Sequence, residues 1–292
     1  MHSTFDQSIR PLSDREFHRF QRMIHDASGI ALSDAKRALI PGRLSRRLRA
    51  FGMQDFSAYL ALVEADSDER TRMLDCICTN ETRFFREPRQ FDFLDQEVLP
   101  RWKALAERGA MPKRIRAWSA ACSTGEEPVS VAMLLRTHFG ADSGWRLDIL
   151  ASDLSSRALT TARQGVWPID RATDIPPHYL RAYMLRGVRS TAGTIRVRPE
   201  VQAMIDFRQI NLVDESDPIE ASFDLIFCRN VLIYFNRETK DAVINRLARH
   251  LVPGGLLLLG HAETITAATP GLQHAGPTTY RHVGSSSERS AS

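Results

Sequence analysis

The sequence predicts two parts: an all-α N-terminal domain and an α/β domain built on a largely parallel sheet. Residues 1–77 show helical patterns only, whereas short apolar runs alternate with helical patterns from residue 113 onward. The first run, 115–119, leads through a turn of small residues into an amphipathic helix that we expect to begin at Pro128. Strand, tight turn and helix in this order are typical of a nucleotide-binding sheet, whose ligands lie beyond the carboxyl ends of the strands.

The composition is that of a globular protein. The chain has 292 residues, 43% hydrophobic and 25% charged, which suits one large and one small domain. No apolar run reaches the ~18 residues of a membrane helix, and no signal peptide is evident. The four cysteines form no CxxC pair, which favours reduced thiols and a cytoplasmic location. A net charge of +4 is too small to indicate a nucleic-acid partner.

The N-terminal domain is expected over residues 1–77. Ser13 and Glu16 form a capping box that begins a helix, and Gly29 is placed to end it. Apolar residues at helical spacing predict further helices over 56–63 and 69–77. These short amphipathic segments indicate a small helical bundle.

A basic helix is expected over residues 42–52. We assign Leu44, Leu48 and Phe51 to the side that faces the core. Residues 35–50 contain six basic residues and no acid, so we expect the arginines to form an exposed positive face. A solvated surface is the usual role of such a charge run, and docking of an acidic partner is the alternative. The arginines concerned are Arg43, Arg46, Arg47 and Arg49.

Residues 78–112 are expected to form a polar linker and a connecting helix over 88–108. Residues 165–205 interrupt the alternation of strands and helices, and we interpret them as an inserted β-subdomain, with a small antiparallel sheet as its expected structure. A turn is expected at 253–255, and residues 284–292 have the composition of a disordered tail. The remaining predicted strands are 147–153, 204–212, 223–230, 256–260 and an edge strand at 278–283, and the remaining helices are 156–164, 178–184 and 237–251.

The turn after the first strand is not a phosphate-binding loop. It lacks the spacing of glycines that such loops need, and Glu126 and Glu127 would repel a pyrophosphate. Acids in this turn suit a ligand with positive charge and hydroxyl groups, such as S-adenosylmethionine. The alternative is an ordinary turn with a solvated acid pair, and this stretch alone favours that alternative.

Polar residues also end the next strands. Asp153 ends the second strand, where an acid binds ribose hydroxyls or caps the following helix. Asn211 ends the third, where an amide can face an adenine or simply form a turn. Arg229 and Asn230 end the fourth, and a buried polar pair is costly without partners, which favours a role in a site.

Six motifs together resemble the chemotaxis receptor methyltransferases, the CheR family. The resemblance covers residues 13–283 in order and with compatible spacing. It implies a helical N-terminal domain, then a Rossmann-like S-adenosylmethionine-dependent methyltransferase domain over 113–283 with the inserted β-subdomain. The motifs are NETRFFRE (80–87), WSAACSTGEEPVSVA (118–132), ASD (151–153), INL (210–212), FCRNVLIYF (227–235) and PGGLLLLGHAE (253–263).

The resemblance implies methyl transfer from S-adenosylmethionine to glutamate side chains on the cytoplasmic helices of chemoreceptors, with S-adenosylhomocysteine as product. It also implies that Arg86 and Tyr234 serve the transfer, and that the turn with Glu126 and Glu127 contacts the methionine part, with Glu127 as the favoured residue of the two. A glutamate carboxylate is already a nucleophile above its pKa of ~4.3, so no general base is required. The implied cofactor-binding residues are Asn80, Thr82, Arg86, Glu126, Glu127, Asp153, Asn211, Leu212, Arg229 and Asn230.

Two other functions are less consistent with the sequence. A nucleic-acid methyltransferase would need an NPPY-like motif or a Pro-Cys nucleophile, and the sequence at Cys228 is neither. A non-catalytic binding module is disfavoured because Arg86, Asp153, Asn230 and Tyr234 are all present. The histidines show no metal-binding spacing, so no metal is expected. The loop within 186–198 is compatible with binding a receptor C-terminal peptide.

Overall fold

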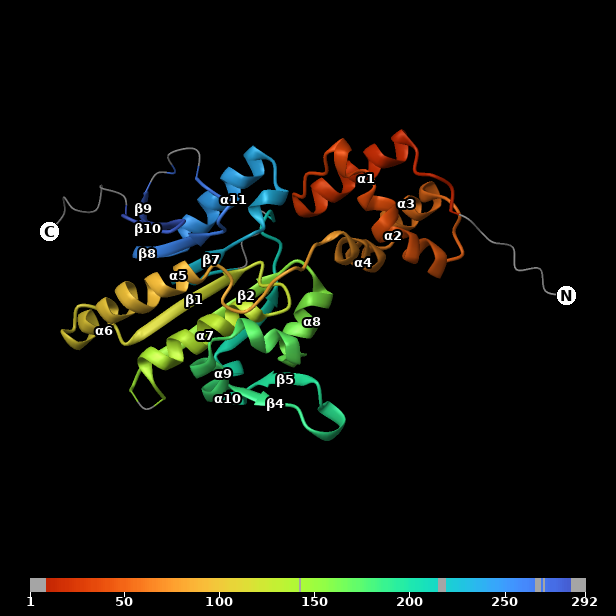
Figure 1. Cartoon of the computed structure of the whole chain (residues 1–292). Coiled ribbons are helices and arrows are strands. Elements are labelled where there is room, and N and C mark those ends of the chain that lie inside the picture. Colours follow the sequence, from red (N-terminus) through yellow and green to blue (C-terminus); the bar gives the residue numbers. More distant parts are fainter. Residues whose placement is uncertain (1–8, 142, 215–218, 266–268, 270, 285–292) are drawn as a thin grey trace. The chain divides into compact units, whose positions relative to one another are not determined.

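The computed structural model describes residues 9–141, 143–214, 219–265, 269 and 271–284. The chain divides into two compact units (Figure 1). The helical unit comprises Met1–Thr79 and Tyr234–Asn236, and the α/β unit comprises Asn80–Ile233 and Arg237–Ser292. The predicted tail, apart from Gly284, lies outside the described residues.

The helical unit consists of α1 (Asp14–Ser28), α2 (Leu39–Ala50), α3 (Phe56–Ala65) and α4 (Ser67–Ile77), with a 3-10 turn at Asp34–Lys36. The capping box is confirmed, because the Ser13 and Glu16 side chains each accept a hydrogen bond from the other's backbone N–H. Gly29 ends α1 in the left-handed region at φ 71°. The helices enclose an apolar core that includes Phe17, Phe20, Ile24, Ile40, Leu44, Leu48, Tyr59 and Leu60.

The assignment of Phe51 to the core is wrong. Its side chain is 44% exposed, and the third core position of α2 is occupied by Ile40, one turn earlier than Leu44. The helix ends at Ala50, so Phe51 no longer follows helical spacing. Instead, the guanidinium of Arg47 lies 5.3 Å from the centroid of the Phe51 ring.

The expected positive face of α2 is also only half right. Arg46 and Arg49 are exposed, but Arg43 donates hydrogen bonds to the carbonyls of Cys76 and Cys78, at 3.1 and 2.9 Å. Arg47 forms a two-pronged ion pair with Glu69, with its Nε 2.9 Å from Oε1. The acid that neutralises this helix therefore comes from α4, which a search of the local sequence cannot find.

Glu69 is fully buried, and its carboxylate also accepts a hydrogen bond from the Tyr59 hydroxyl at 2.7 Å. Burial raises the pKa of this carboxyl group, but the hydrogen bonds from Arg47 and Tyr59 outweigh that effect and leave the pKa below its usual value. The same burial and the nearby carboxylate raise the pKa of Tyr59. Arg47, Glu69 and Tyr59 thus form one coupled network that joins α2, α3 and α4.

The α/β unit contains a seven-stranded sheet in the order β6-β2-β1-β7-β8-β10-β9. Five neighbouring strands run parallel, and β10 and β9 complete the sheet in antiparallel pairing. The chain proceeds outward from β1 to β6 and then returns to β7, so the strand order reverses between β1 and β7. The strands are β1 (Arg114–Ala120), β2 (Arg146–Asp153), β6 (Ile205–Gln209), β7 (Phe223–Cys228), β8 (Leu251–Leu259), β9 (Leu272–Gly276) and β10 (Thr279–His282).

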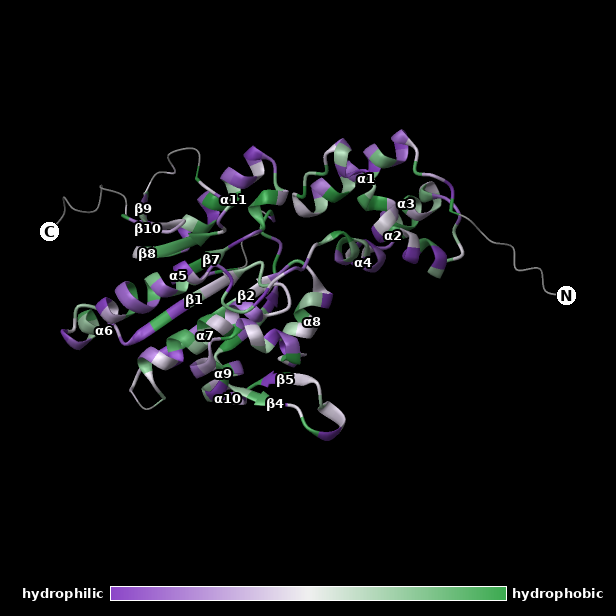
Figure 2. Ribbon diagram, in the orientation of Figure 1, coloured by the Kyte–Doolittle hydropathy of each residue, from purple (hydrophilic) through white to green (hydrophobic). Residues whose placement is uncertain are grey.

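Helices pack against this sheet. The predicted connecting helix runs from Pro88 to Glu107, with a π-helical segment at Leu94–Val98 between α5 and α6. β8 is largely hydrophobic along its length (Figure 2), as expected for a strand inside a covered sheet. The helices of the unit are α5 (Pro88–Phe93), α6 (Leu99–Glu107), α7 (Glu126–Phe139), α8 (Ser156–Gln164), α9 (Pro177–Tyr183), α10 (Pro199–Gln202) and α11 (Arg237–Arg249).

The inserted segment forms the expected small antiparallel sheet, in the order β3-β5-β4. Its strands are β3 (Val166–Pro168), β4 (Met184–Arg186) and β5 (Thr194–Val197).

Several predicted boundaries need correction. The strand at Thr279–His282 is not at the edge of the sheet, because β9 pairs with its other side. Pro253 and its two glycines lie within β8, next to a shift in the register of pairing with β7. A proline is tolerated in a strand at such an irregularity. The third parallel strand ends at Gln209 and leaves Asn211 in the following loop.

We expect Arg47→Met to destabilise the helical unit by about 2–3 kcal/mol, because the variant leaves the buried Glu69 carboxylate without its cation. A lowered pKa in the folded state means that the carboxylate contributes stability above its unfolded pKa. The difference between wild type and variant should therefore shrink as the pH falls below ~4.3. Hydrogen exchange of α2 and α4 amides in the full chain measures this. Arg49→Met on the same helix is the control, and equal effects of the two variants would contradict the assignment.

Candidate functional site

The candidate site lies at the carboxyl ends of β1, β2, β7 and β8, beside the reversal in strand order between β1 and β7. In open α/β sheets this is where ligands bind. The turn after β1 has an unusual backbone, with φ of 68° at Ala121, 51° at Ser123 and 94° at Gly125. A Cβ atom at Gly125 would lie 2.9 Å from that of Ala162, so only glycine lets α8 pack this closely. The turn is therefore closely constrained.

Asp153 anchors this turn. One carboxylate oxygen accepts a hydrogen bond from the Ser123 N–H at 2.7 Å and the other from the Ser155 N–H at 2.8 Å. The cap of α8 is Ser155, whose hydroxyl accepts from the Ala158 N–H. The alternative that Asp153 caps the helix is thus wrong. Both carboxylate oxygens thus hold backbone N–H groups beside the end of the second strand, and the side chain is 7% exposed.

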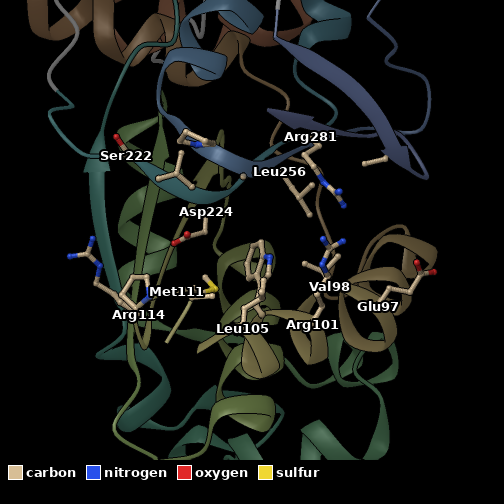
Figure 3. A pocket seen from close by; sticks show the side chains of 18 of the residues that line it. Glu97, Val98, Arg101, Leu105, Met111, Arg114, Ser222, Asp224, Leu256 and Arg281 are labelled. Carbon is tan, nitrogen blue, oxygen red and sulfur yellow. The ribbon is translucent and has the colours of Figure 1, made fainter. Parts of the chain in front are cut away.

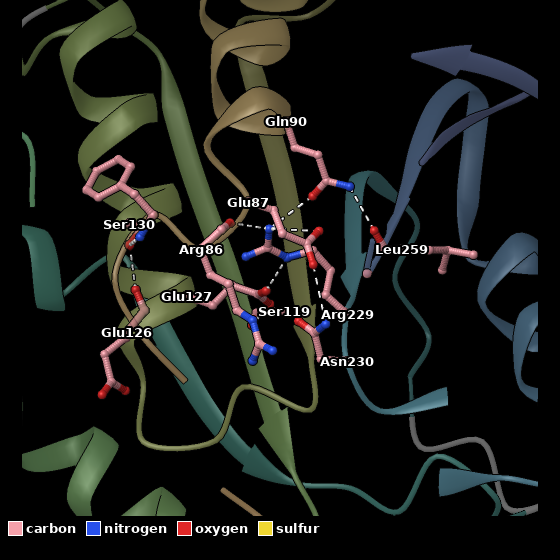
Figure 4. Close-up of polar contacts among 12 residues, drawn as sticks. Arg86, Glu87, Gln90, Ser119, Glu126, Glu127, Ser130, Arg229, Asn230 and Leu259 are labelled. Atoms are coloured by element: carbon pink, nitrogen blue, oxygen red, sulfur yellow. Dashed lines mark hydrogen bonds and ion pairs between the residues drawn. The ribbon is translucent and has the colours of Figure 1, made fainter. Parts of the chain in front are cut away.

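Glu127 is buried and paired. Its Oε1 accepts from the Ser119 hydroxyl at 2.7 Å, and its Oε2 accepts from the Arg229 Nε at 2.7 Å. Arg229 is 6% exposed, and its Nη1 donates to the Arg86 carbonyl at 2.6 Å and to Gln90 Oε1 at 3.0 Å (Figure 4). The guanidinium therefore joins the end of β7, the start of α7 and the linker.

Glu126 points away from this pair (Figure 4). Its Oε2 accepts from the Thr124 hydroxyl at 2.6 Å, and no ion pair within 4.0 Å reaches it from any residue that the structure describes. Burial raises the pKa of this carboxyl group. Both glutamates are less than a tenth exposed, so the interpretation as a solvated acid pair is wrong. The helix begins at Glu126, two residues before Pro128, which encloses both acids.

Sequence reasoning gave no role to Glu263 and Glu87. Glu263 is 1% exposed and accepts hydrogen bonds from the backbone N–H groups of Gly260 and Asn230, at 2.7 and 2.8 Å. Glu87 Oε1 accepts from the His261 N–H at 2.9 Å and from the Asn230 amide at 3.3 Å. The family motifs contain both glutamates, but only the tertiary structure gives them partners.

The other predicted site residues of this unit occupy nearby loops. The Asn80 side chain donates to the Ser155 hydroxyl at 3.3 Å, and the Thr82 carbonyl accepts from Arg171 at 2.9 Å. The guanidinium of Arg86 points away from Arg229 (Figure 4) and donates to the Glu81 carbonyl. Asn211 accepts from the Val213 N–H, which closes a local turn, and Leu212 is 8% exposed.

Tyr234 groups with the helical unit. Its carbonyl accepts a hydrogen bond from the Ala31 N–H at 2.8 Å, and the Lys36 ammonium lies 5.7 Å from the centroid of its ring. The four arginines of α2 also belong to that unit. Tyr234 and these arginines are therefore described with the helical unit and not with the site at the strand ends.

The charges at the strand ends do not balance. The described residues of the α/β unit include four buried acids but only one buried guanidinium, that of Arg229. Buried charges are stable only with partners, so this imbalance favours a ligand that brings positive charge. In the described parts of the chain, no group of three or more His, Cys, Asp or Glu side chains could hold a metal ion. The acids are Glu126, Glu127, Asp153 and Glu263.

Two family models match the chain. The all-alpha domain of CheR methyltransferases matches residues 15–78, and their SAM binding domain matches residues 80–281. The chain belongs to the CheR methyltransferase family. The chemotaxis protein methyltransferase of Salmonella typhimurium is 36% identical, over 92% of this chain and 90% of its own. That of Escherichia coli is 37% identical over 92% and 91%, and that of Borreliella burgdorferi is 36% identical over 95% and 97%.

As a CheR methyltransferase, the protein uses S-adenosylmethionine as cofactor. The residues at the strand ends fit this cofactor, because its sulfonium and ammonium groups would meet an excess of buried carboxylates and because Asp153 ends β2, where an acid binds ribose hydroxyls. None of the described helices is long and apolar enough to cross a membrane.

Proposed function

We propose that the protein transfers the methyl group of S-adenosylmethionine to glutamate side chains of chemoreceptors and so forms glutamate methyl esters. The proposal rests on membership of the CheR family and on the excess of buried carboxylates at the strand ends, which suits a cationic cofactor. A glutamate oxygen attacks the methyl carbon, a carbon–oxygen bond forms, and the sulfur of the cofactor leaves with the electron pair of its bond to the methyl group. No proton has to move.

The residues of the protein bind and orient. Asp153 holds the ribose, Asn211 and Leu212 border the adenine, and Glu126 or Glu127 receives the ammonium group. We favour Glu126 for this contact, in place of the expected Glu127, because Glu127 already has its cation in Arg229 whereas Glu126 has none within 4.0 Å among the residues described. Arg229 and Asn230 form the floor of the site.

Arg86 and Tyr234 act on the transfer itself in this proposal. The planar fork of Arg86 can hold a carboxylate through two parallel hydrogen bonds, either that of the substrate or that of the methionine part. The receptor glutamate needs no further activation once its carboxylate lies in line with the sulfonium methyl group and has lost its bound water. We place the reaction in the cytoplasm, on the helical domain of the receptor, with the inserted β-sheet as the site for a receptor C-terminal peptide.

Transfer of labelled methyl from S-adenosylmethionine to receptor-containing membranes tests the function, with DNA and RNA as alternative acceptors. Arg86→Gln and Tyr234→Phe should melt like wild type but lose most of the turnover, by roughly 10²-fold, since each removes an interaction made at the reacting atoms. Arg83→Gln, an exposed arginine of the same linker, is the control. Labelling of nucleic acid instead of receptor would refute the proposal.

Asp153→Asn should weaken binding of S-adenosylmethionine by about 1–3 kcal/mol, the cost of losing hydrogen bonds to a charged group. Isothermal titration calorimetry measures this, and thermal melting reports separately on the anchor that Asp153 gives to the turn. Asp148→Asn, at the other end of the same strand, is the matched control. A folded Asp153→Asn protein with unchanged affinity would restrict Asp153 to holding the turn.

The docking proposal now rests on Arg46 and Arg49, the exposed arginines of α2. Arg46→Glu with Arg49→Glu should raise the apparent KM for receptor about fivefold at low salt, because exposed ion pairs contribute up to ~1 kcal/mol, and should flatten its salt dependence. The same charge change at the exposed Arg15 and Arg22 of α1 is the control. If both double variants behave alike, α2 has no special role in docking.

A further inference from the structure

A pocket lies at the amino-terminal ends of β1, β7 and β8, opposite the strand ends that form the cofactor site. It is bordered by Arg114, the first residue of β1, by Asp224 near the start of β7 and by Val252 near the start of β8. The seven residues of β1 rise about 3.3 Å each, so the pocket and the turn after β1 lie ~20 Å apart along this strand. The pocket has a volume of about 550 Å³, within the range of small-molecule sites.

One wall of this pocket is apolar and partly aromatic. It is formed by the connecting helix, the loop before β1 and the first half of β8. Trp102 from α6 belongs to it and is 9% exposed, so its ring is fixed by packing. Val98, Leu105, Met111 and Leu256 of the lining are seen in Figure 3. Such a wall suits a flat, apolar body of a ligand. Its apolar members include Phe93, Val98, Trp102, Leu105, Met111, Pro112, Val252 and Leu256.

Two arginines converge on the pocket from different elements. Arg101 comes from α6 and Arg281 from β10, and their guanidinium groups point toward one another (Figure 3). Within the part of the chain that the structure describes, neither side chain has a hydrogen bond or an ion pair, and Glu97 on the same helix lies beyond 4.0 Å from both. Two unpaired like charges that face one another repel, and a dianion between them would remove that repulsion.

An acceptor lies deeper, at Asp224. Its Oδ2 accepts a hydrogen bond from the Arg116 N–H at 2.8 Å, which leaves acceptor capacity for a hydroxyl or amino group of a ligand. Burial raises the pKa of Asp224, and the Arg116 N–H and the charges of Arg114 and Arg116 offset this only in part. Asp224 thus has two arginines of its own nearby, whereas Arg101 and Arg281 form no ion pair among the residues described.

We infer that this pocket is a second ligand site that binds a small organic phosphate, with its phosphate between Arg101 and Arg281 and its flat body against Trp102. The planar forks of two arginines match the oxygens of a phosphate dianion. The site is independent of the cofactor site, because no lining residue belongs to the loops that hold S-adenosylmethionine in the proposal above.

Binding of 1-naphthyl phosphate to the full-length protein saturated with S-adenosylhomocysteine tests this inference, since the saturated cofactor site cannot accept the probe. Calorimetry should show one molecule bound per chain. Arg101→Gln with Arg281→Gln should weaken binding at least tenfold, while Lys103→Gln, on the same helix and outside the pocket lining, should not. Inorganic phosphate and 1-naphthol should each bind more weakly than 1-naphthyl phosphate, since each offers only half of the contacts.

Arg101 is exposed, so Arg101→Gln alone will fold and should weaken binding at least threefold even if the double variant does not fold. No binding of 1-naphthyl phosphate at millimolar concentration would overturn the inference. Equal affinity in wild type and Arg101→Gln, or equal binding of 1-naphthol, would overturn it as well. Methyl transfer to receptors is measured separately, so a failure here leaves the proposed function untouched.

Discussion

The buried pair of Glu127 and Arg229 is the interaction on which the arrangement of the site depends. Arg229 directly follows β7, yet it bonds Glu127 in α7, the Arg86 carbonyl in the linker and the Gln90 side chain in α5. A buried ion pair adds little net stability, because desolvation offsets the attraction, but removing one partner is expensive. The pair therefore acts mainly by fixing positions. It holds three segments that are distant in sequence at one corner of the sheet.

The remaining carboxylates then explain why the site suits a cation. Arg229, the buried arginine of the described α/β residues, already pairs with Glu127. Glu126 therefore has no ion-pair partner within 4.0 Å among the residues described. Its raised pKa means that the ionised form is disfavoured by folding, so this group costs stability as the pH rises from its unfolded pKa of ~4.3 toward the raised pKa of the folded state. A bound ammonium or sulfonium would offset this cost, so cofactor binding and stability are linked.

Much of the fold follows from local patterns, and the errors have one physical origin. The capping box at Ser13 and the helix over 156–164 were predictable, because neighbours in sequence determine them. The inserted antiparallel sheet was predictable for another reason, because the segment interrupts the alternation of strands and helices. The roles of Arg47 and Glu263 were not predictable, because Glu69 lies 22 residues from Arg47 and Asn230 lies 33 residues from Glu263 in the sequence. A charge pattern indicates which residues need partners, but only the tertiary structure says where those partners come from.

The backbone of the site adds a second cost that the same network has to support. Of the seven described non-glycine residues with positive φ, five lie in the linker or in the loops after β1 and β7. Each such residue costs of the order of 1–3 kcal/mol and persists only where its surroundings hold it. Asp153 bonds the Ser123 N–H, Glu263 bonds the Asn230 N–H, and Ser130 accepts from the Phe85 N–H. Buried side chains thus hold the backbone in strained conformations at the place where the cofactor is proposed to bind. This rigidity is what in-line methyl transfer requires, since displacing the reacting atoms by about 1 Å can lower the rate ~10²-fold. The five residues are Phe85, Glu87, Ala121, Ser123 and Asn230.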